Sequence, residues 1–498
     1  MKYVFSILSF LSFLIINRIV SQKIAIIGCG IGGSSQAYYL ANSLNNAEIH
    51  IFDENKLCGG RIKNVKIVHN ITSEVGANFF ILQNELLVNL IKDLNLTSHI
   101  AKGDDNSISF WDGKQVYFQL GNWKVINLFK MFYRYGFAML KAKVALNEHL
   151  VKFIKFYTKI ISKPGKKTKT FRSLKTMLKG MKLLNLVNNT TVNYLLSFGI
   201  NENFIEEFFQ SIIASLYNQD KNINAFAGFV TLAALLNEPY SITGGNIKLI
   251  KRLIKSTKNI LGDRMRIFRR VRVFEIEKKK KNFELKFKKL NAMNDTEYST
   301  LSYDIVVFAV PLSQSSVNFI NFESIHPRNF EEFKYKKTFV NYIAGDLKYS
   351  VFNFINAEEI PYLILSNNPK STLVSEIKTI CKGCYGFNNR KVNVYQVQAN
   401  HNLTKEEIEI LFDSHKLIYS QEWKYAYPKL DPVNIDDLPD FEIDKNVFHI
   451  NAIEKASSCM EMILISSKNI ANIITNKLNN VPKNNKKKKN KRKKKDGL

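Results

Sequence analysis

Residues 24–37 read IAIIGCGIGGSSQA, and this stretch decides the fold. Four apolar residues that favour a strand run into a glycine-rich turn, and a segment compatible with a helix follows. Gly28 allows a tight turn, Gly30 lets the backbone approach a phosphate, and Gly33 lets helix and strand pack closely. Gly32 lies in the same turn, where the helix N-terminus offers N–H groups and a positive dipole end to an anion. The order strand, turn, helix therefore predicts a dinucleotide pyrophosphate site at these glycines.

An acid at the end of the next apolar run supports this interpretation. Residues 48–52 read EIHIF and precede Asp53, which lies twenty residues beyond Gly33. A carboxylate at this distance is placed for a ribose hydroxyl of a dinucleotide. A glycine-rich turn alone can arise by chance, but strand, helix and acid together favour a Rossmann-type fold of the α/β class.

The chain is long for one core at 498 residues, so we expect two domains. Strand-like apolar runs occur at the start, near residues 265–310 and near residue 448, whereas residues 122–236 have the apolar periodicity of helices. A contiguous Rossmann domain would not be interrupted in this way. We therefore predict a discontinuous cofactor domain of residues 23–121, 240–318 and 438–480, interleaved with a mixed α+β substrate domain of residues 122–239 and 319–437.

The N-terminus has the pattern of a secretory signal peptide. Lys2 precedes a run of fourteen mostly apolar residues, 3–16, which Asn17 and Arg18 end. The run suits a signal-peptide core and falls short of a membrane span. We predict that residues 1–22 are a signal peptide and that the protein enters the secretory pathway, to be secreted or to reside in the lysosome. An uncleaved anchor is the alternative.

Secretory entry gives meaning to the Asn-x-Ser/Thr triplets of the chain. Such triplets are common by chance in an asparagine-rich sequence, so it is their number beside a signal peptide that predicts some glycosylation. They begin at Asn70, Asn95, Asn188, Asn189, Asn294 and Asn402.

Five cysteines are too few for a disulfide scaffold. We interpret Cys29, in the glycine turn, and Cys58, before a second glycine pair, as packing residues. Cys381 and Cys384 form a Cys-x-x-Cys motif, for which a local disulfide is favoured in an oxidising compartment and a redox-active pair is the alternative. A zinc site would need two further ligands, and no second such motif occurs, so no metal is expected.

The formal net charge of +29 raises the question of an anionic partner. Residues 481–498 form a basic tail, which we predict to be disordered. The tail has no aromatic residues for base stacking, and a signal peptide would take the chain away from nucleic acid, so no nucleic-acid partner is expected. Contact of the tail with an anionic membrane surface or with glycans is the functional alternative to a solvated end.

A second glycine pair follows Asp53 closely. Gly59 and Gly60 permit close approach of the backbone to a cofactor, and Arg61 can offer several donors to a phosphate. The alternative is a simple turn with a surface arginine. A Gly-Gly-Arg motif at this place resembles the second cofactor motif of FAD-dependent oxidases with the amine-oxidase and glutathione-reductase type of fold, in which discontinuous segments hold the FAD.

Further along, the chain resembles the prenylcysteine oxidase family over roughly residues 23–478. The central and C-terminal segments that carry the resemblance are specific to that family, whereas many flavoproteins share the glycine turn. These segments are residues 217–220 (YNQD), 223–228 (INAFAG), 243–246 (TGGN), 303–311 (YDIVVFAVP), 425–428 (YAYP) and 451–462 (NAIEKASSCMEM).

This resemblance implies an FAD enzyme that cleaves the thioether of a prenylated cysteine, a small-molecule substrate, with O2 as oxidant. It implies that a hydride passes from the prenyl carbon on sulfur to the flavin. Water then adds to that carbon, and the hemithioacetal collapses to cysteine and a prenyl aldehyde. Reoxidation by dioxygen gives hydrogen peroxide. Because sulfur stabilises the developing cation, positioning in a dry apolar pocket matters more than an acid or base, and no catalytic residue is assigned.

The resemblance also implies cofactor-binding residues outside the N-terminal segment. Gly244 and Gly245 would bring backbone close to the flavin, with a simple helix-entry turn as the alternative. Glu454 would contact the ribityl chain or the pyrophosphate region, with a solvated first-turn acid as the alternative. Apolar residues around 204–229 are candidates to line a slot for the isoprenoid tail, although most are expected to be ordinary core.

The chain departs from the family pattern at two positions. Ala452 stands where the family usually has glycine, and Thr243 stands where the family has an acid before the glycine pair. These departures bear on substrate choice more than on cofactor binding. Two alternatives stay open: another flavin oxidase, acting on amines or an isoprenoid lipid, and a catalytically silent secreted flavoprotein. Hydrolase chemistry is not indicated, because the chain has neither a Gly-x-Ser-x-Gly nor a His-Glu-x-x-His motif.

Overall fold

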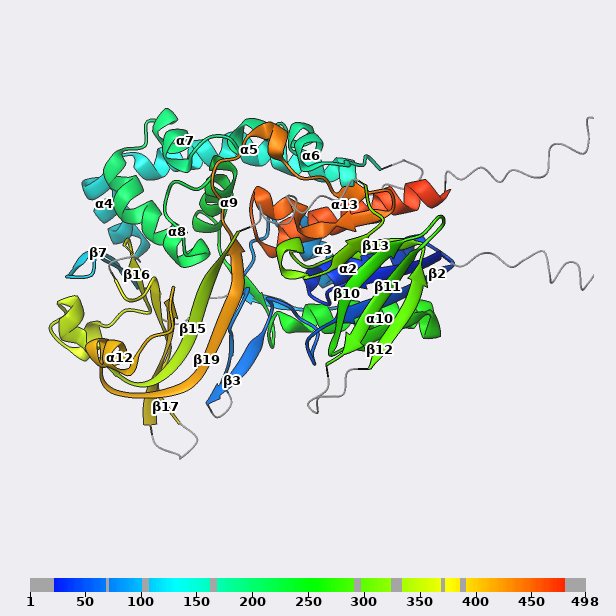
Figure 1. Ribbon diagram of the computed structural model, residues 1–498. Helices are drawn as coiled ribbons and strands as arrows, with labels where there is room; N and C mark the ends of the chain where they lie inside the picture. Colours follow the sequence, from blue (N-terminus) through cyan, green and yellow to red (C-terminus); the bar gives the residue numbers. More distant parts are fainter. Residues whose placement is uncertain are drawn as a thin grey trace, which may run out of the picture.

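The computed structural model describes residues 22–68, 71–100, 107–161, 168–290, 297–323, 334–368, 372–385 and 391–479. Three larger sheets and two short β-ribbons form its β structure, and helices pack against them (Figure 1). No helix in these ranges is long and apolar enough to cross a membrane.

The six-stranded sheet has the order β20-β21-β13-β1-β2-β9 and is parallel except at β20. Its strands are β1 (Gln22–Ile27), β2 (Ala47–Asp53), β9 (Met265–Arg269), β13 (Ile305–Phe308), β20 (Glu442–Asp444) and β21 (Val447–His449). Ile24 on β1 pairs with Ile49 on β2 and with Ile305 on β13, so the strand before the glycine turn is central. The sheet draws its strands from three separate stretches of the chain.

Both faces of this sheet are covered, which explains the apolar runs of its strands. Ile24 and Ile26 face the core shared with the helices α2 (Ile31–Ser43), α10 (Ile247–Leu261) and α13 (Met460–Asn479). Ala25 and Ile27 point to the other side and pack against a four-stranded sheet. That sheet contains β10 (Val271–Lys278), β11 (Phe283–Lys289), β12 (Tyr298–Tyr303) and β14 (Asn318–Ile320).

A second unit combines a seven-stranded sheet with a group of helices. The sheet has the order β19-β15-β18-β17-β16-β6-β7 and is antiparallel except where β16 pairs with β6. Its strands are β6 (Ile108–Trp111), β7 (Val116–Leu120), β15 (Tyr335–Leu347), β16 (Leu363–Ser366), β17 (Glu376–Tyr385), β18 (Lys391–Ala399) and β19 (Phe412–Pro428). In Figure 1 the helices gather beyond one end of this sheet; they are α4 (Lys124–Tyr135), α5 (Ala138–Ile160), α6 (Leu174–Met181), α7 (Thr191–Ser197), α8 (Gln210–Tyr217) and α9 (Ala225–Leu235).

Shorter elements complete the two units. They are β3 (Asn64–Val68), β4 (Ile71–Glu74), α3 (Glu85–Asp93), β5 (Ser98–Ile100), β8 (Tyr240–Ile242) and α12 (Lys405–Leu411). The predicted fold class, a Rossmann-type α/β unit interleaved with a mixed α+β unit, is confirmed, whereas the domain boundaries stay a prediction.

Several predicted features fall outside the described residues. The signal peptide does so except for Gln22, as do the tail at residues 481–498 and the triplets at Asn70 and Asn294. Of the other triplets, Asn95, Asn188 and Asn402 are exposed and Asn189 is half-buried. Their glycosylation stays a prediction.

Candidate cofactor and substrate site

The first glycine turn joins β1 to α2 and leaves no room for a side chain at Gly28 or Gly33. Gly28 has φ +106°, and a Cβ on it would lie 2.6 Å from Val310 Cγ1. A Cβ on Gly33 would lie 1.9 Å from the carbonyl oxygen of Gly28, so Gly33 allows the close packing that was predicted. Gly28, Gly30 and Gly32 line a large cavity, and Gly33 is buried behind them. Helix α2 begins without a capping side chain, which suits an anion at its N-terminus.

The second glycine turn lies directly against the first. The Gly59 N–H donates to the Cys29 carbonyl oxygen over 3.0 Å. A Cβ on Gly60 would lie 3.2 Å from Gly30 Cα, and Gly60 itself has φ +57°. Both turns line the same cavity. The two backbones therefore form one cradle that side chains larger than hydrogen would fill.

A disulfide joins Cys29 to Cys58 and links the two turns. The interpretation of these cysteines as packing residues is therefore wrong. Two signals could have found the pair: each cysteine flanks a turn expected at the same pyrophosphate, and the predicted compartment is oxidising. The local disulfide predicted between Cys381 and Cys384 is confirmed.

Asp53 ends β2 beside the first turn. Its Oδ2 accepts from the Cys29 N–H over 2.6 Å, and its Oδ1 accepts from the Asn55 N–H over 2.8 Å. Burial raises the pKa of Asp53, although these hydrogen bonds act in the opposite direction. The carboxylate also lines the cavity. The structure thus brings together the acid and the turn whose spacing predicted a ribose and pyrophosphate site.

Arg61 and Glu454 form an ion pair between residues 393 positions apart, with Arg61 Nη2 2.5 Å from Glu454 Oε1. The Glu454 side chain is fully buried. It also accepts from the side chains of Ser458, Asn451 and Tyr335. Burial opposes its ionisation, but Arg61 and these donors outweigh burial and lower the pKa of Glu454.

Glu454 does not line the cavity, whereas Arg61 does. The solvated alternative for Glu454 is therefore wrong, because the residue is buried in a short 3-10 helix, Ile450–Lys455, before α13. Its contact with a cofactor stays a prediction, and its observed contact is with Arg61. Arg61 Nη1 also donates to the Ala426 carbonyl oxygen over 3.2 Å, so the guanidinium is held from two sides.

Gly244 and Gly245 form the turn before α10 and have φ +80° and +102°. Both line the large cavity. The Asn246 N–H, directly after them, donates to Glu74 Oε1 over 2.6 Å. Burial raises the pKa of Glu74 to about 7, against that hydrogen bond. Sequence reasoning missed Glu74, because no motif surrounds it. Only the tertiary structure brings Glu74 next to the turn at Gly244 and Gly245, about 170 residues later in the chain.

The cavity has a volume of about 1970 Å³, larger than an ordinary pocket for one small ligand. Part of its wall is apolar and comes from α5, α8 and α9, and another part is polar and comes from the seven-stranded sheet. The apolar part includes Leu150, Phe153, Ile212, Leu216, Phe229, Val230 and Ala233. The polar part includes Thr338, Glu376, Gln396 and Gln398.

The predicted isoprenoid slot at residues 204–229 is only partly placed in this wall. Ile212, Leu216 and Phe229 line the cavity. Phe204 and Phe208 do not; their rings pack against each other at 5.2 Å in the core. The first part of the segment, at Phe204 and Phe208, therefore belongs to the ordinary hydrophobic core.

The N-terminus of α13 brings a further acid that sequence reasoning missed. Glu461 lines the cavity yet is 2% exposed, and it accepts from the Leu86 and Leu87 N–H groups at 2.9 and 3.0 Å. The Tyr157 hydroxyl donates to it over 2.7 Å. Burial raises its pKa to about 7, although these donors act in the opposite direction. Glu461 thereby ties α13 to the start of α3.

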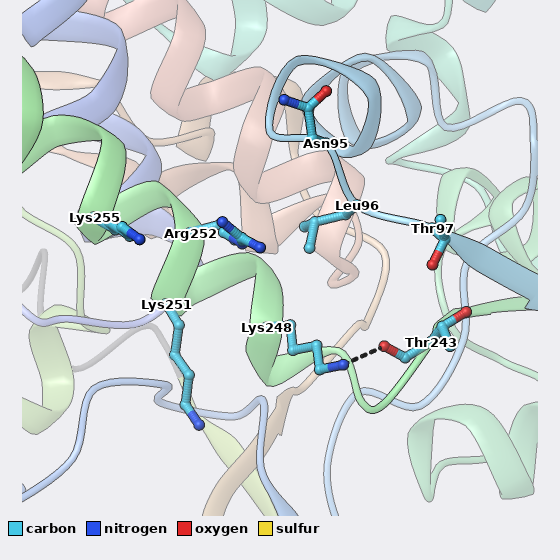
Figure 2. Close-up of a pocket in the computed structure, with 8 residues that line it drawn as sticks. All are labelled: Asn95, Leu96, Thr97, Thr243, Lys248, Lys251, Arg252 and Lys255. Atoms are coloured by element: carbon cyan, nitrogen blue, oxygen red, sulfur yellow. Dashed lines mark hydrogen bonds between the residues drawn. The ribbon is translucent and has the colours of Figure 1, made fainter.

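A smaller pocket of about 440 Å³ lies between α10 and the loop after α3 (Figure 2). Lys248, Lys251, Arg252 and Lys255 line it from the helix, and the triplet that starts at Asn95 lines it from the loop after α3. Lys248 Nζ donates to the Thr243 carbonyl oxygen over 2.9 Å. None of the ten predicted cofactor residues lines this pocket.

The residues of the large cavity fit a bound dinucleotide. They supply a side-chain-free backbone cradle, an uncapped helix N-terminus, an acid at the end of β2 and a fixed guanidinium. No cluster of three metal-ligating side chains occurs among the residues that the structure describes. The arrangement can bind an anionic cofactor beside an apolar chamber.

Comparisons with known proteins identify the family and the Rossmann-like segment of the chain. A family described as prenylcysteine lyase matches residues 118–487, and an NAD(P)-binding Rossmann-like domain matches residues 26–94. Prenylcysteine oxidase 1 of Mus musculus is 27% identical over 464 residues, covering 91% of this chain and 89% of the mouse protein. The Homo sapiens protein of that name is 27% identical over 477 residues, with the same coverages.

Solved structures with this fold include a cyclohexylamine oxidase from Brevibacterium oxydans, with a TM-score of 0.57 and 14% identity over 92% of this chain and all of that one. A fatty acid isomerase from P. acnes has a TM-score of 0.61 and 14% identity, covering 90% of this chain and 97% of that one. These likenesses show the fold alone. The relatives and the family together support an oxidoreductase, and the chain belongs to the prenylcysteine lyase family.

Proposed function

We propose that this protein is an FAD-dependent oxidase that cleaves the thioether of a farnesyl- or geranylgeranylcysteine. The overall reaction converts the substrate, O2 and water into cysteine, a prenyl aldehyde and hydrogen peroxide. Besides family membership, one observation carries the proposal: a single cavity contains both the dinucleotide cradle and an extended apolar wall.

The residues that would hold the FAD are those of the cradle. Backbone at Gly28, Gly30 and Gly60 would face its pyrophosphate, and Asp53 would accept from a ribose hydroxyl. Arg61, oriented by Glu454, would supply a positive charge. When bound, the flavin supplies a two-electron acceptor for the hydride that leaves the prenyl carbon and a site of reoxidation by O2.

The cavity wall would then bind the substrate at both ends, the apolar isoprenoid tail and the polar amino-acid group. The apolar side chains of α5, α8 and α9 would bury the isoprenoid tail, with about 0.8 kcal/mol for each CH2 group removed from water. Glu376 on β17 would face the amino-acid end, because its carboxylate lines the polar wall. Burial raises the pKa of Glu376, and the Ser215 hydroxyl donates to it.

These residues position the substrate and exclude water; no proton transfer to the protein is needed before the carbon–sulfur bond breaks. The sulfur stabilises the electron-poor carbon, water attacks it, and the hemithioacetal releases the cysteine thiol. A dry, shaped wall therefore contributes more than a strong base. Localisation in the secretory pathway is part of the proposal, and the two disulfides support it.

The test is the absorption spectrum of the purified protein before and after anaerobic addition of farnesylcysteine. We expect a flavin spectrum that is bleached by the substrate, FAD in the supernatant after denaturation, and equal amounts of peroxide and aldehyde in air. A colourless protein that releases no FAD would contradict the proposal. If a polyamine bleaches the flavin and the thioether does not, the protein is another flavin oxidase. If neither compound bleaches the bound FAD, the protein is a catalytically silent flavoprotein.

A further inference from the structure

Helix α4 lies on the surface with most of its apolar side chains in solvent. Only two of its twelve residues are buried. Val125, Leu128, Phe129 and Phe132 follow one another at helical spacing along one stripe, and each is between 53% and 71% exposed. A surface helix of a globular protein normally turns such a stripe toward the core. The stripe of α4 faces away from it.

The apolar surface extends beyond α4 in both directions. Trp123, directly before the helix, is 75% exposed, and Phe137, between α4 and α5, packs its ring edge-on against Phe132 at 5.1 Å. A second stripe of exposed residues at helical spacing follows along α5. We call the whole set the apolar helical face; it comprises Trp123, Val125, Ile126, Leu128, Phe129, Phe132, Tyr133, Phe137, Leu140, Val144, Val151 and Ile154.

Basic residues outnumber acids around this face, where Glu148 pairs with Lys152 and Glu207 pairs with Arg134. Residues 124–160 contain eight lysines and arginines and a single acid, Glu148. Lys130, Lys143 and Lys155 are exposed beside the apolar stripes. Monomeric soluble proteins rarely expose an apolar patch of this extent. The combination of aromatic and aliphatic side chains with flanking lysines complements an anionic lipid surface, where both the apolar groups and the charges find partners.

We propose that the apolar helical face docks on an anionic lipid bilayer, with α4 in the interfacial plane and its stripe inserted among the acyl chains. Lys124, in the first turn of α4, lines the large cavity, as do Leu150 and Phe153 of α5. Docking would therefore bring one wall of the cavity next to the membrane. This inference does not depend on the reaction, because it rests on the exposed side chains and charges of α4 and α5 alone.

The first test uses Trp123 as an intrinsic probe in the full-length protein. The chain has three tryptophans; Trp111 is 3% exposed, and the Trp423 indole donates to the Val75 carbonyl oxygen, so Trp123 is the exposed one. With vesicles of phosphatidylcholine and phosphatidylserine we expect a blue shift of emission and quenching by brominated lipid. Trp123→Phe should abolish both signals. Unchanged emission of the wild-type protein would overturn the proposal.

The second test is flotation of a Leu128→Ser/Phe129→Ser variant with the same vesicles. Loss of two inserted side chains should weaken partitioning at least about tenfold. Ile355→Ser is the matched control, because Ile355 is 82% exposed in a loop outside α4 and α5, and this variant should bind like the wild type. Thermal melting confirms that the variants fold. High salt removes purely electrostatic binding by the basic tail. The difference in flotation between the wild type and Leu128→Ser/Phe129→Ser should therefore persist at high salt.

Equal flotation of Leu128→Ser/Phe129→Ser and the wild type at high salt would overturn the proposal. A wild-type dimer in the absence of lipid that the same substitutions dissociate would also overturn it, because it would assign the face to a second copy of this chain. Sedimentation velocity of both proteins without vesicles measures this outcome. A monomeric wild type supports the bilayer as the occupant.

Discussion

Cys29 and Cys58 are joined by a disulfide that ties the first glycine turn of the Rossmann unit to the second. The bond spans 29 residues of sequence and lies beside Asp53, whose carboxylate accepts from the Cys29 N–H. The two turns that would hold the cofactor are thus linked by the disulfide and by the hydrogen bond from the Gly59 N–H to the Cys29 carbonyl oxygen.

Cys29→Ala/Cys58→Ala should lower both stability and cofactor retention. A closed loop of this length contributes up to about 3–4 kcal/mol through the entropy of the unfolded chain. We expect a lower Tm and a larger fraction of FAD lost on dialysis. Cys381→Ala/Cys384→Ala removes a disulfide away from the glycine turns and is the matched control. Equal FAD loss in the two variants would contradict a specific role of the first disulfide.

Glu454→Gln should destabilise the protein by about 1–3 kcal/mol, because it leaves the Arg61 charge in a half-buried site without its ionic partner. Weaker FAD binding should accompany the loss, since the guanidinium is no longer oriented. Urea unfolding and FAD titration measure the two effects. Glu54→Gln breaks an exposed pair with Arg272 and should cost less than about 1 kcal/mol. Similar losses in both variants would count against the buried pair.

Glu74 should make stability depend on pH. Its pKa is raised from 4.5 to about 7, so the folded state binds a proton that the unfolded state has lost between these values. Stability from this group is therefore full below about pH 4.5 and falls as the pH rises toward 7. Its Oε2 is buried with no hydrogen-bond partner among the described residues, which favours a proton there.

Glu74→Gln should remove this contribution and flatten the pH profile. The measurement is Tm from pH 4.5 to 7.5 for both proteins, roughly the interval between the two pKa values. Glu461→Gln is the variant with which the pH profile of Glu74→Gln is compared. The pKa of Glu461 is also raised to about 7, but both of its carboxylate oxygens accept hydrogen bonds, from α3 and from Tyr157. A wild-type Tm that rises steadily over this range would contradict the assignment.

Gly33→Ala should prevent folding or cost more than about 3 kcal/mol, because the new Cβ would lie 1.9 Å from a backbone oxygen that cannot move aside. Soluble yield and urea unfolding report the effect. At Gly121 a Cβ would meet nothing within 4 Å, so Gly121→Ala should change stability by less than about 0.5 kcal/mol. A soluble Gly33→Ala protein of normal stability would show that α2 can shift.

Ala233→Phe should raise KM for farnesylcysteine while leaving the FAD content unchanged. Ala233 lies in the apolar wall of the cavity, so a ring there would occupy space proposed for the isoprenoid tail. Steady-state kinetics and the flavin spectrum separate the two effects. An unchanged KM with farnesylcysteine would place the tail elsewhere. Loss of FAD would instead indicate a distorted fold.

The N-terminal nucleotide fold could be predicted in detail because its signals are local. The glycine turn, the strand before it and the acid after it lie within 30 residues and follow from backbone sterics and apolar periodicity. Strand β12 has no such local signal, because its sequence, YSTLSY, is mostly exposed and carries no apolar alternation. Glu74 and Glu461 were missed because the groups that hydrogen-bond to them lie far away in the sequence.

The sequence by itself determined that this chain has a Rossmann-type cradle at its four glycines and Asp53, because a tight turn at Gly28 and close helix packing at Gly33 exclude a Cβ at these two positions. Only the tertiary structure decided that Arg61 is held by Glu454, that Cys29 bonds Cys58, and that the apolar stripe of α4 points outward. Each of these depends on which distant segments meet or fail to meet. Local residue patterns do not contain that information, since apolar periodicity gives a helix a face but not the direction in which it points.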